Sequence, residues 1–171
     1  MYKFLKSYIL LVVLVLALGS TSCENNSITP EAKLTTIQDL EVQPGFAWYR
    51  EKKANYQSDS TIIKEIKNIE IKDKIYLFVK PSCSCIGTQT TFPSFMRILE
   101  DAGIPSDKYE LYFMSGDNDK HPYQTSLQIT SLPSFFVKKS DKFYSIIDTM
   151  NSKFNTNPTI KIEEILLDAL K

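Results

Sequence analysis

The spacing of apolar residues changes from strand-like to helical in the middle of the chain. A continuous apolar run over 75–79 predicts a buried strand. Apolar positions at helical spacing from Phe92 to Leu99 predict a helix that ends at Gly103. Pro93 lies inside this helix, where it removes one backbone hydrogen bond and is expected to kink it. A strand followed directly by a helix is therefore the first unit of the predicted fold.

Three more strands and two more helices are predicted after residue 103. The strands are expected at 109–114, 132–137 and 143–148, and the helices at 122–129 and 159–170. Two parallel strands followed by an antiparallel hairpin, with helices covering both faces, form an α/β sandwich. The predicted fold class is therefore α/β, with a mixed central sheet flanked by helices.

Residues 31–73 are expected to form a helical extension ahead of this sheet. One helix is expected to open at Pro44. A second is expected to begin at an N-cap formed by Asp59 or Ser60, because isoleucines at helical spacing follow. The aromatic side chains of the first helix are expected to pack on the sheet rather than to form a ligand surface.

The first 22 residues have the three parts of a secretory signal. Two lysines precede an apolar run over 9–18, and small residues then lead to Cys23. The apolar run is too short to span a bilayer comfortably, so an export signal is expected rather than a transmembrane helix. The segment resembles the lipobox of bacterial lipoproteins, in which the cysteine takes the lipid, although Ser20 stands where leucine is usual. The alternative is ordinary cleavage that leaves a free cysteine.

The chain divides into a signal peptide at 1–22, a tether at 23–40 and one domain at 41–171 with its core at 73–171. The sequence has three cysteines, so one is left over if two form a disulfide. An unpaired thiol is a liability in an oxidising compartment. Lipidation of Cys23 removes the odd cysteine, which supports a membrane anchor at this position.

Composition excludes several classes of partner. The 171 residues carry a formal net charge of zero, with both signs interspersed, so a nucleic-acid partner is not expected. Only five glycines are present, which argues against a phosphate-binding loop. We expect a monomer with one hydrophobic core.

Two cysteines, Cys83 and Cys85, stand between the first strand and the first helix of the core. Unpaired backbone N–H groups and the positive end of the helix dipole stabilise a thiolate there and lower the pKa of the thiol. The thiolate is the nucleophile in disulfide exchange. This pair is therefore the candidate reactive site.

Three features of the core together resemble the thioredoxin fold family. They are a cysteine at the strand-to-helix turn, a helix interrupted by Pro93, and the pair Leu132 and Pro133 at the start of a strand. In that family the last proline is cis and lies beside the active-site cysteine, where neighbouring backbone pairs with substrate. The resemblance implies a thioredoxin-like sandwich in which Pro133 is cis and Leu132 and Pro133 position the substrate.

The cysteine motif departs from the family's C-x-x-C pattern. Counting forward from the strand makes Cys83 the nucleophile, whereas counting back from Pro93 makes Cys85 the nucleophile and puts Thr88 in place of the resolving cysteine. We prefer the second register, because a helix fixes spacing more rigidly than a loop. A disulfide across one residue is expected to be strained and easily reduced. Residues 76–78 also offer no counterpart of the family's buried acid, so an oxidant or isomerase is expected rather than a strong reductant.

The expected function is that of a membrane-tethered thiol–disulfide oxidoreductase or isomerase without a cofactor. Its partners would be exported proteins or small thiols, and its place the bacterial cell envelope, facing the periplasm or on the outer surface. Two alternatives use the same cysteines: a soft-metal protein that binds Cu(I), and an interaction module with a permanent disulfide. No metal-ligand set is predicted, because His121 is expected to be a solvated loop histidine.

Overall fold

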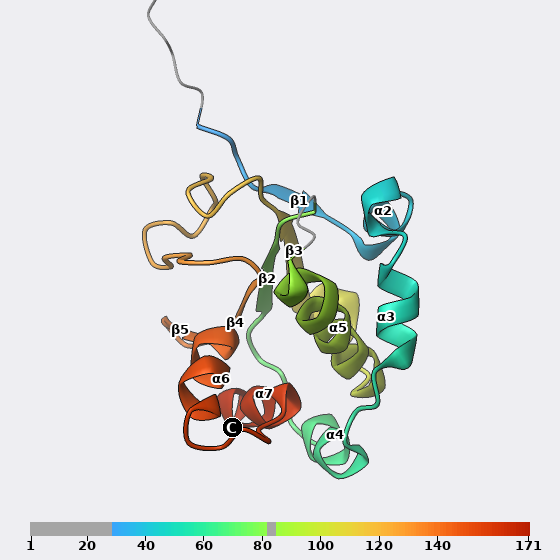
Figure 1. Cartoon of the computed structure of the whole chain (residues 1–171). Helices are drawn as coiled ribbons and strands as arrows, with labels where there is room; N and C mark the ends of the chain where they lie inside the picture. The colour runs from blue at the N-terminus through green and yellow to red at the C-terminus, as the bar shows by residue number, and fades with distance from the viewer. Residues whose placement is uncertain (1–28, 82–84) are drawn as a thin grey trace, which may run out of the picture.

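The structure is a computed structural model, and it describes residues 29–81 and 85–171. A five-stranded mixed sheet runs through it in the order β1-β3-β2-β4-β5 (Figure 1). The strands are β1 (Lys33–Thr35), β2 (Ile75–Val79), β3 (Tyr109–Phe113), β4 (Ser134–Lys139) and β5 (Lys142–Ser145). Strand β2 pairs in parallel with β3, and the other neighbouring strands pair antiparallel. The predicted mixed α/β class is confirmed.

Six α-helices and three short helical segments accompany the sheet within the described residues. The α-helices are α2 (Ile37–Glu41), α3 (Tyr49–Asn55), α4 (Ser60–Lys67), α5 (Phe92–Asp101), α6 (Ile146–Phe154) and α7 (Ile162–Leu170). The short segments are η1 (Pro44–Phe46), η2 (Gly87–Thr91) and η3 (Ser106–Lys108). The predicted N-cap of α4 is confirmed, because the Asp59 carboxylate accepts hydrogen bonds from the backbone N–H groups of Thr61 and Ile62. Within the described ranges no helix is long and apolar enough to cross a membrane.

Among the described residues, helices cover only one face of the sheet, which corrects the expectation of helices on both. The larger core cluster joins alternate strand residues such as Leu77 and Phe135 to buried residues of α3 to α7. The second cluster lies on the opposite sheet face, where Phe78 and Tyr112 meet Leu127 from the loop between β3 and β4. A loop takes the place of the helix predicted at 122–129, which forms a turn instead.

This loop is held against the sheet by aromatic and polar contacts, which explain why a helix does not form. The rings of Tyr123 and Tyr76 lie 4.5 Å apart between centroids. The Tyr123 hydroxyl donates to Oε2 of Glu110, 2.5 Å away, and Lys74 Nζ lies 2.8 Å from Oε1. Burial raises the pKa of the Glu110 carboxyl, but hydrogen bonds from Lys74, Tyr123 and Tyr112 outweigh it and leave the pKa lowered. Glu110 is thus an ionised anchor for the loop.

The second half of the predicted strand at 143–148 is helical. Strand β5 ends at Ser145, whose hydroxyl accepts a hydrogen bond from the backbone N–H of Asp148 at 3.1 Å. A serine in this position caps the first turn of a helix, so the chain turns into α6 instead of continuing as a strand.

The segment ahead of the core contains a strand that the sequence pattern did not predict. Strand β1 pairs antiparallel with β3, with Lys33 opposite Phe113 and Thr35 opposite Leu111. The Leu40 side chain is fully buried in the larger core cluster. The packed part of the chain therefore begins ahead of the expected boundary at residue 41.

The pairing registers bring four strand ends to one end of the sheet, which we call the cysteine end. Strands β2 and β3 finish there at Val79 and Phe113, and β1 and β4 begin there at Lys33 and Ser134. The opposite end, which we call the hairpin end, carries the turn between β4 and β5 at residues 139–142. Since Cys85 follows β2, the candidate site belongs to the cysteine end.

Candidate functional site

Cys85 occupies the amino end of a helix. Its backbone carbonyl accepts a hydrogen bond from the N–H of Gln89 at 3.1 Å, which is the first bond of the helix that continues into α5. Cys85 is half-buried, and the next side chain, Ile86, is 80% exposed. The cysteine thus lies where unpaired helix N–H groups stabilise negative charge, beside an exposed side chain.

Thr88 places a hydroxyl beside the sulfur of Cys85. The Thr88 side chain is fully buried, and its Oγ1 lies 3.2 Å from the Cys85 Sγ. Cys85 is disulfide-bonded in the structure, so its sulfur carries no proton and the hydroxyl is the donor in this contact. The same hydroxyl can donate to the thiolate of the reduced form, where a hydrogen bond to a charged acceptor is stronger.

Pro133 packs against the first turn of the same helix. The Leu132–Pro133 peptide bond is cis, which confirms the prediction for this proline. A Cβ added to Gly87, two residues after Cys85, would lie 3.2 Å from Cδ of Pro133. The absence of a side chain at Gly87 therefore allows the buried proline ring to lie directly against the turn that carries the cysteine.

The helix is irregular ahead of Pro93, where the kink was predicted. The segment η2 (Gly87–Thr91) is a π-helix, and the backbone N–H of Phe92 donates to the carbonyl of Gly87, five residues earlier. Wider turns of this kind are found within helices at functional sites. The irregular turn lies between Cys85 and α5, and it contains Thr88.

The other two predicted cysteines, Cys23 and Cys83, lie outside the described residues. Cys85 is the one cysteine in the ranges 29–81 and 85–171, and it is disulfide-bonded. The structure thus places Cys85 and Pro133 at one site and leaves the roles of Cys83 and Cys23 as expectations from the sequence.

His121 is not the freely solvated loop residue that the sequence suggested. It is half-buried, its ring lies 5.3 Å from that of Phe78, and its Nδ1 is buried without a hydrogen-bond partner among the described residues. Burial lowers the pKa of this imidazole, because it disfavours the charged form. Across the described ranges, no group of three or more His, Cys, Asp or Glu side chains is arranged to hold a metal ion.

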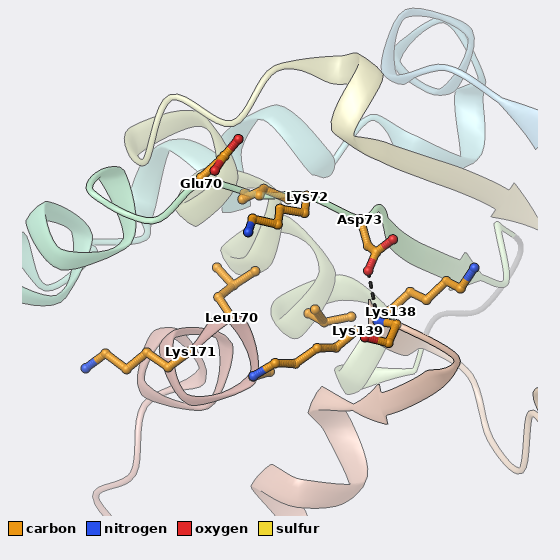
Figure 2. Close-up of a pocket in the computed structure, with 11 residues that line it drawn as sticks. Glu70, Lys72, Asp73, Lys138, Lys139, Leu170 and Lys171 are labelled. Atoms are coloured by element: carbon orange, nitrogen blue, oxygen red, sulfur yellow. Dashed lines mark hydrogen bonds between the residues drawn. The ribbon is translucent and has the colours of Figure 1, made fainter.

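A pocket of about 280 Å³ lies at the hairpin end, away from Cys85 (Figure 2). Its charged lining residues are Glu70, Lys72, Asp73, Lys138, Lys139 and Lys171. The Asp73 carboxylate accepts a hydrogen bond from the backbone N–H of Ser140 at 3.0 Å, which ties the β4–β5 turn to the chain ahead of β2. Of the predicted site residues that the structure describes, none lines this pocket.

Cys83, Cys85 and Pro133 are predicted site residues, whereas Gly87 and Thr88 are site residues that were not predicted. The signal for Thr88 was present, because it stands three residues after Cys85, in the position of a resolving cysteine. Gly87 could have been noticed because it is a glycine, a residue that allows another part of the chain to approach the backbone closely.

Comparison with protein-family models, with curated protein sequences and with solved structures finds no match to this chain.

Proposed function

We propose that the chain is a thiol–disulfide oxidoreductase or isomerase of the thioredoxin-like class, in which Cys85 is the nucleophile. The observation that carries the proposal is the setting of Cys85. It is half-buried at the amino end of a helix, with a hydroxyl donor 3.2 Å from its sulfur and a proline-bearing loop packed on its turn. A structural disulfide needs neither an accessible sulfur nor a donor directed at it.

The thioredoxin-like assignment is supported by the order of features along the chain. A buried strand leads to the cysteine, a helix follows it, and a cis proline precedes the antiparallel strand β4. The spacing of eight residues from Cys85 to Pro93 matches the register in which Cys85 takes the nucleophile position. Thr88 then takes the position of the resolving cysteine, and Cys83 is left to resolve from the other side.

Exchange in this site would proceed in two balanced steps. The Cys85 thiolate attacks one sulfur of a substrate disulfide, so that an S–S bond to Cys85 forms, the substrate bond breaks, and the departing thiolate takes up a proton. The Cys83 thiolate then attacks the Cys85 sulfur and releases the second substrate thiol. The cysteine pair is oxidised by two electrons and the substrate is reduced by two, and the reverse sequence oxidises a substrate dithiol.

The proposed role of Leu132 and Pro133 is to position the substrate. Pro133 packs against Gly87, in the turn between Cys85 and Thr88, which supports a role in which the backbone ahead of Pro133 would pair with an extended segment that presents its sulfur to Cys85. The loop that delivers this backbone is fixed by Tyr123 and Glu110 and by a hydrogen bond from the Ser134 hydroxyl to the carbonyl of Ser131 at 2.6 Å. A loop held in one position favours a preorganised substrate site.

Lipidated Cys23 would hold the domain on the membrane of a bacterial envelope, where exported proteins with thiols or disulfides are its substrates, and no cofactor is required. A one-residue spacing between Cys83 and Cys85 favours an oxidant or isomerase. The reduction potential of this pair tests the assignment, because a permanent disulfide of an interaction module has a much lower potential than a catalytic one. Stoichiometric Cu(I) in the purified reduced protein would instead indicate the metal-binding function.

We expect Thr88→Val to slow the reaction of Cys85 with iodoacetamide at neutral pH about tenfold, since a hydrogen bond to a charged acceptor contributes about 1.5 kcal/mol. Valine has a similar shape to threonine but no hydroxyl, so less thiolate is present. Reactivity would be measured by mass spectrometry in a chain whose other two cysteines are serine. Thr88→Ser keeps the hydroxyl and should react at nearly the original rate. Equal rates for the valine and serine variants would show that the hydroxyl has no role.

A further inference from the structure

The chain enters the domain at the same end as Cys85. The backbone N–H of Ala32 donates to the carbonyl of Lys120 at 2.7 Å, and that of Lys120 donates to the carbonyl of Pro30 at 2.8 Å. These bonds clamp the incoming chain to the loop that follows β3. Strand β1 then starts at Lys33, opposite the last residue of β3, Phe113. The incoming chain is therefore fixed at the cysteine end before it pairs with the sheet.

The sheet order gives the lateral distance between this entry point and the end of β2. One strand, β3, lies between β1 and β2. Neighbouring strands are about 4.8 Å apart, so the start of β1 and the end of β2 are separated by about 10 Å across the sheet. Cys85 follows the end of β2, so it belongs to the same end of the sheet. In Figure 1 the C-terminus lies toward the opposite end of the molecule from β1.

The length of chain between Cys23 and the clamp limits how the domain can turn on a membrane. Pro30 follows Cys23 by seven residues, which span at most about 25 Å even when fully extended. A domain the size of residues 29–171 has a radius of gyration of about 14 Å and hence a diameter of roughly 37 Å. A lipid on Cys23 cannot reach along the whole domain, so the domain cannot stand on the lipid surface with its hairpin end down and its cysteine end facing away.

We propose that the reactive end of the anchored domain faces the membrane, so that its substrate is a protein held at that membrane, with a thiol or disulfide close to the lipid surface. This inference rests on the proposed function and on lipidation of Cys23. Freely diffusing small thiols would gain nothing from this orientation. A membrane-held protein would meet Cys85 at a high effective concentration, because both partners are confined to one surface.

Energy transfer to labelled lipids tests the orientation without any redox reaction. A chain of residues 23–171 with Cys83→Ser and Cys85→Ser would be coupled through Cys23 to a maleimide lipid in phosphatidylcholine and phosphatidylglycerol vesicles that contain acceptor-labelled lipid. A donor fluorophore would replace Ile86 at the cysteine end or Asp141 at the hairpin end, both of which are exposed. We expect the larger loss of donor fluorescence at position 86. An equal or larger loss at position 141 would overturn the proposal.

A matched control moves the anchor to the other end of the domain. Lys171 lines the pocket at the hairpin end, so a cysteine added after it, in a chain with Cys23→Ser, should reverse the order of the two losses. A spacer of ten residues inserted between Asn26 and Ser27 extends the reach by about 33 Å and should shrink the difference between the two positions. A difference unchanged by the spacer would show that the tether does not set the orientation.

Substrate preference is read separately, on the active chain with its own cysteines. Exchange with a lipid-anchored disulfide peptide is expected to be faster than with the same peptide in solution, and to slow when the anchor is moved to the C-terminus. Equal rates for the two anchor positions would overturn the substrate class. Loss of exchange with both peptides would contradict the proposed function and leave the orientation standing. A membrane-isolated protein whose mass shows no acyl chains would overturn the anchor and this inference with it.

Discussion

Replacement of Cys85 by serine is expected to abolish disulfide exchange, whereas replacement of Cys83 is expected to stop the reaction halfway. Cys85 is the half-buried cysteine at the helix end beside Thr88, so it forms the first bond with a substrate sulfur. Without it, the rate of glutathione disulfide reduction should fall to that of the solution without protein. Without Cys83 the first step still occurs, but no thiol is left to release the substrate, and a mixed disulfide should accumulate.

The measurement is mass spectrometry of soluble chains that also carry Cys23→Ser, quenched with acid after incubation with glutathione disulfide. Cys83→Ser should gain the mass of one glutathione, and Cys85→Ser should gain none. The reverse pattern, with glutathione accumulating on Cys85→Ser, would make Cys83 the nucleophile and would support the register counted from the strand. Both variants should unfold at the temperature of the reduced parent chain, which controls for loss of fold.

Replacement of Glu163 by alanine is expected to reduce the free energy of unfolding by about 3 kcal/mol, because it removes two hydrogen bonds to a buried charged acceptor. Glu163 is fully buried at the start of α7. Its carboxylate accepts from the Tyr56 hydroxyl at 2.6 Å and from the backbone N–H of Asp59 at 3.0 Å. Burial and this hydrogen bond raise the pKa of Tyr56, so the tyrosine stays protonated as the donor. Without Glu163, two donors would be left without their acceptor.

Urea unfolding of the two variants, with a surface control, would measure this effect. Glu163→Gln keeps an oxygen that can accept from Asp59 and should lose clearly less stability than alanine. Asp168→Ala lies on the same helix and removes only the exposed pair with Lys153, so it should change stability by less than about 0.5 kcal/mol. A loss below about 1 kcal/mol for Glu163→Ala would show that Glu163 does not hold the segment ahead of β2 against α7.

The elements that could be predicted from the sequence are those whose buried positions are occupied by apolar residues without interruption. Strand β2 is buried at all five positions, and α5 buries a full helical face. The spacing of apolar residues in the sequence therefore indicates a strand in the first case and a helix in the second. Strand β1 has three residues with mostly exposed side chains, and it is ordered by pairing with β3 rather than by burial. A short edge strand of this kind has no hydrophobic period to detect.

The helix predicted at 122–129 failed because tertiary contacts overrode local preference. Pro122 is compatible with a helix start, but Tyr123 directs its ring to Tyr76 and its hydroxyl to Glu110, more than ten residues away in the chain. The helix α6 was missed for the opposite reason. Its signal, Ser145 three residues before Asp148, is local, but the residues ahead of it continue a strand pattern and favour a longer strand.

The candidate site was predictable where it depends on chain order and not where it depends on contacts. The position of Cys85 at a helix start follows from the order of strand, cysteine and helix, and the cis bond at Pro133 was implied by the resemblance to the thioredoxin fold family. The packing of Pro133 against Gly87 joins residues more than forty positions apart, and no spacing rule indicates it. The half-burial of His121 on Phe78 likewise depends on how the loop crosses the sheet.

The reduction potential of the Cys83–Cys85 pair is the measurement that tests the central claim most directly. The soluble chain would be equilibrated with reduced and oxidised glutathione, quenched with acid, alkylated, and its free thiols counted by mass spectrometry. The account predicts a two-electron transition between about −120 and −230 mV, the range of catalytic oxidants, isomerases and glutaredoxins. A disulfide that resists reduction below about −300 mV, where structural disulfides lie, would contradict catalysis and indicate an interaction module.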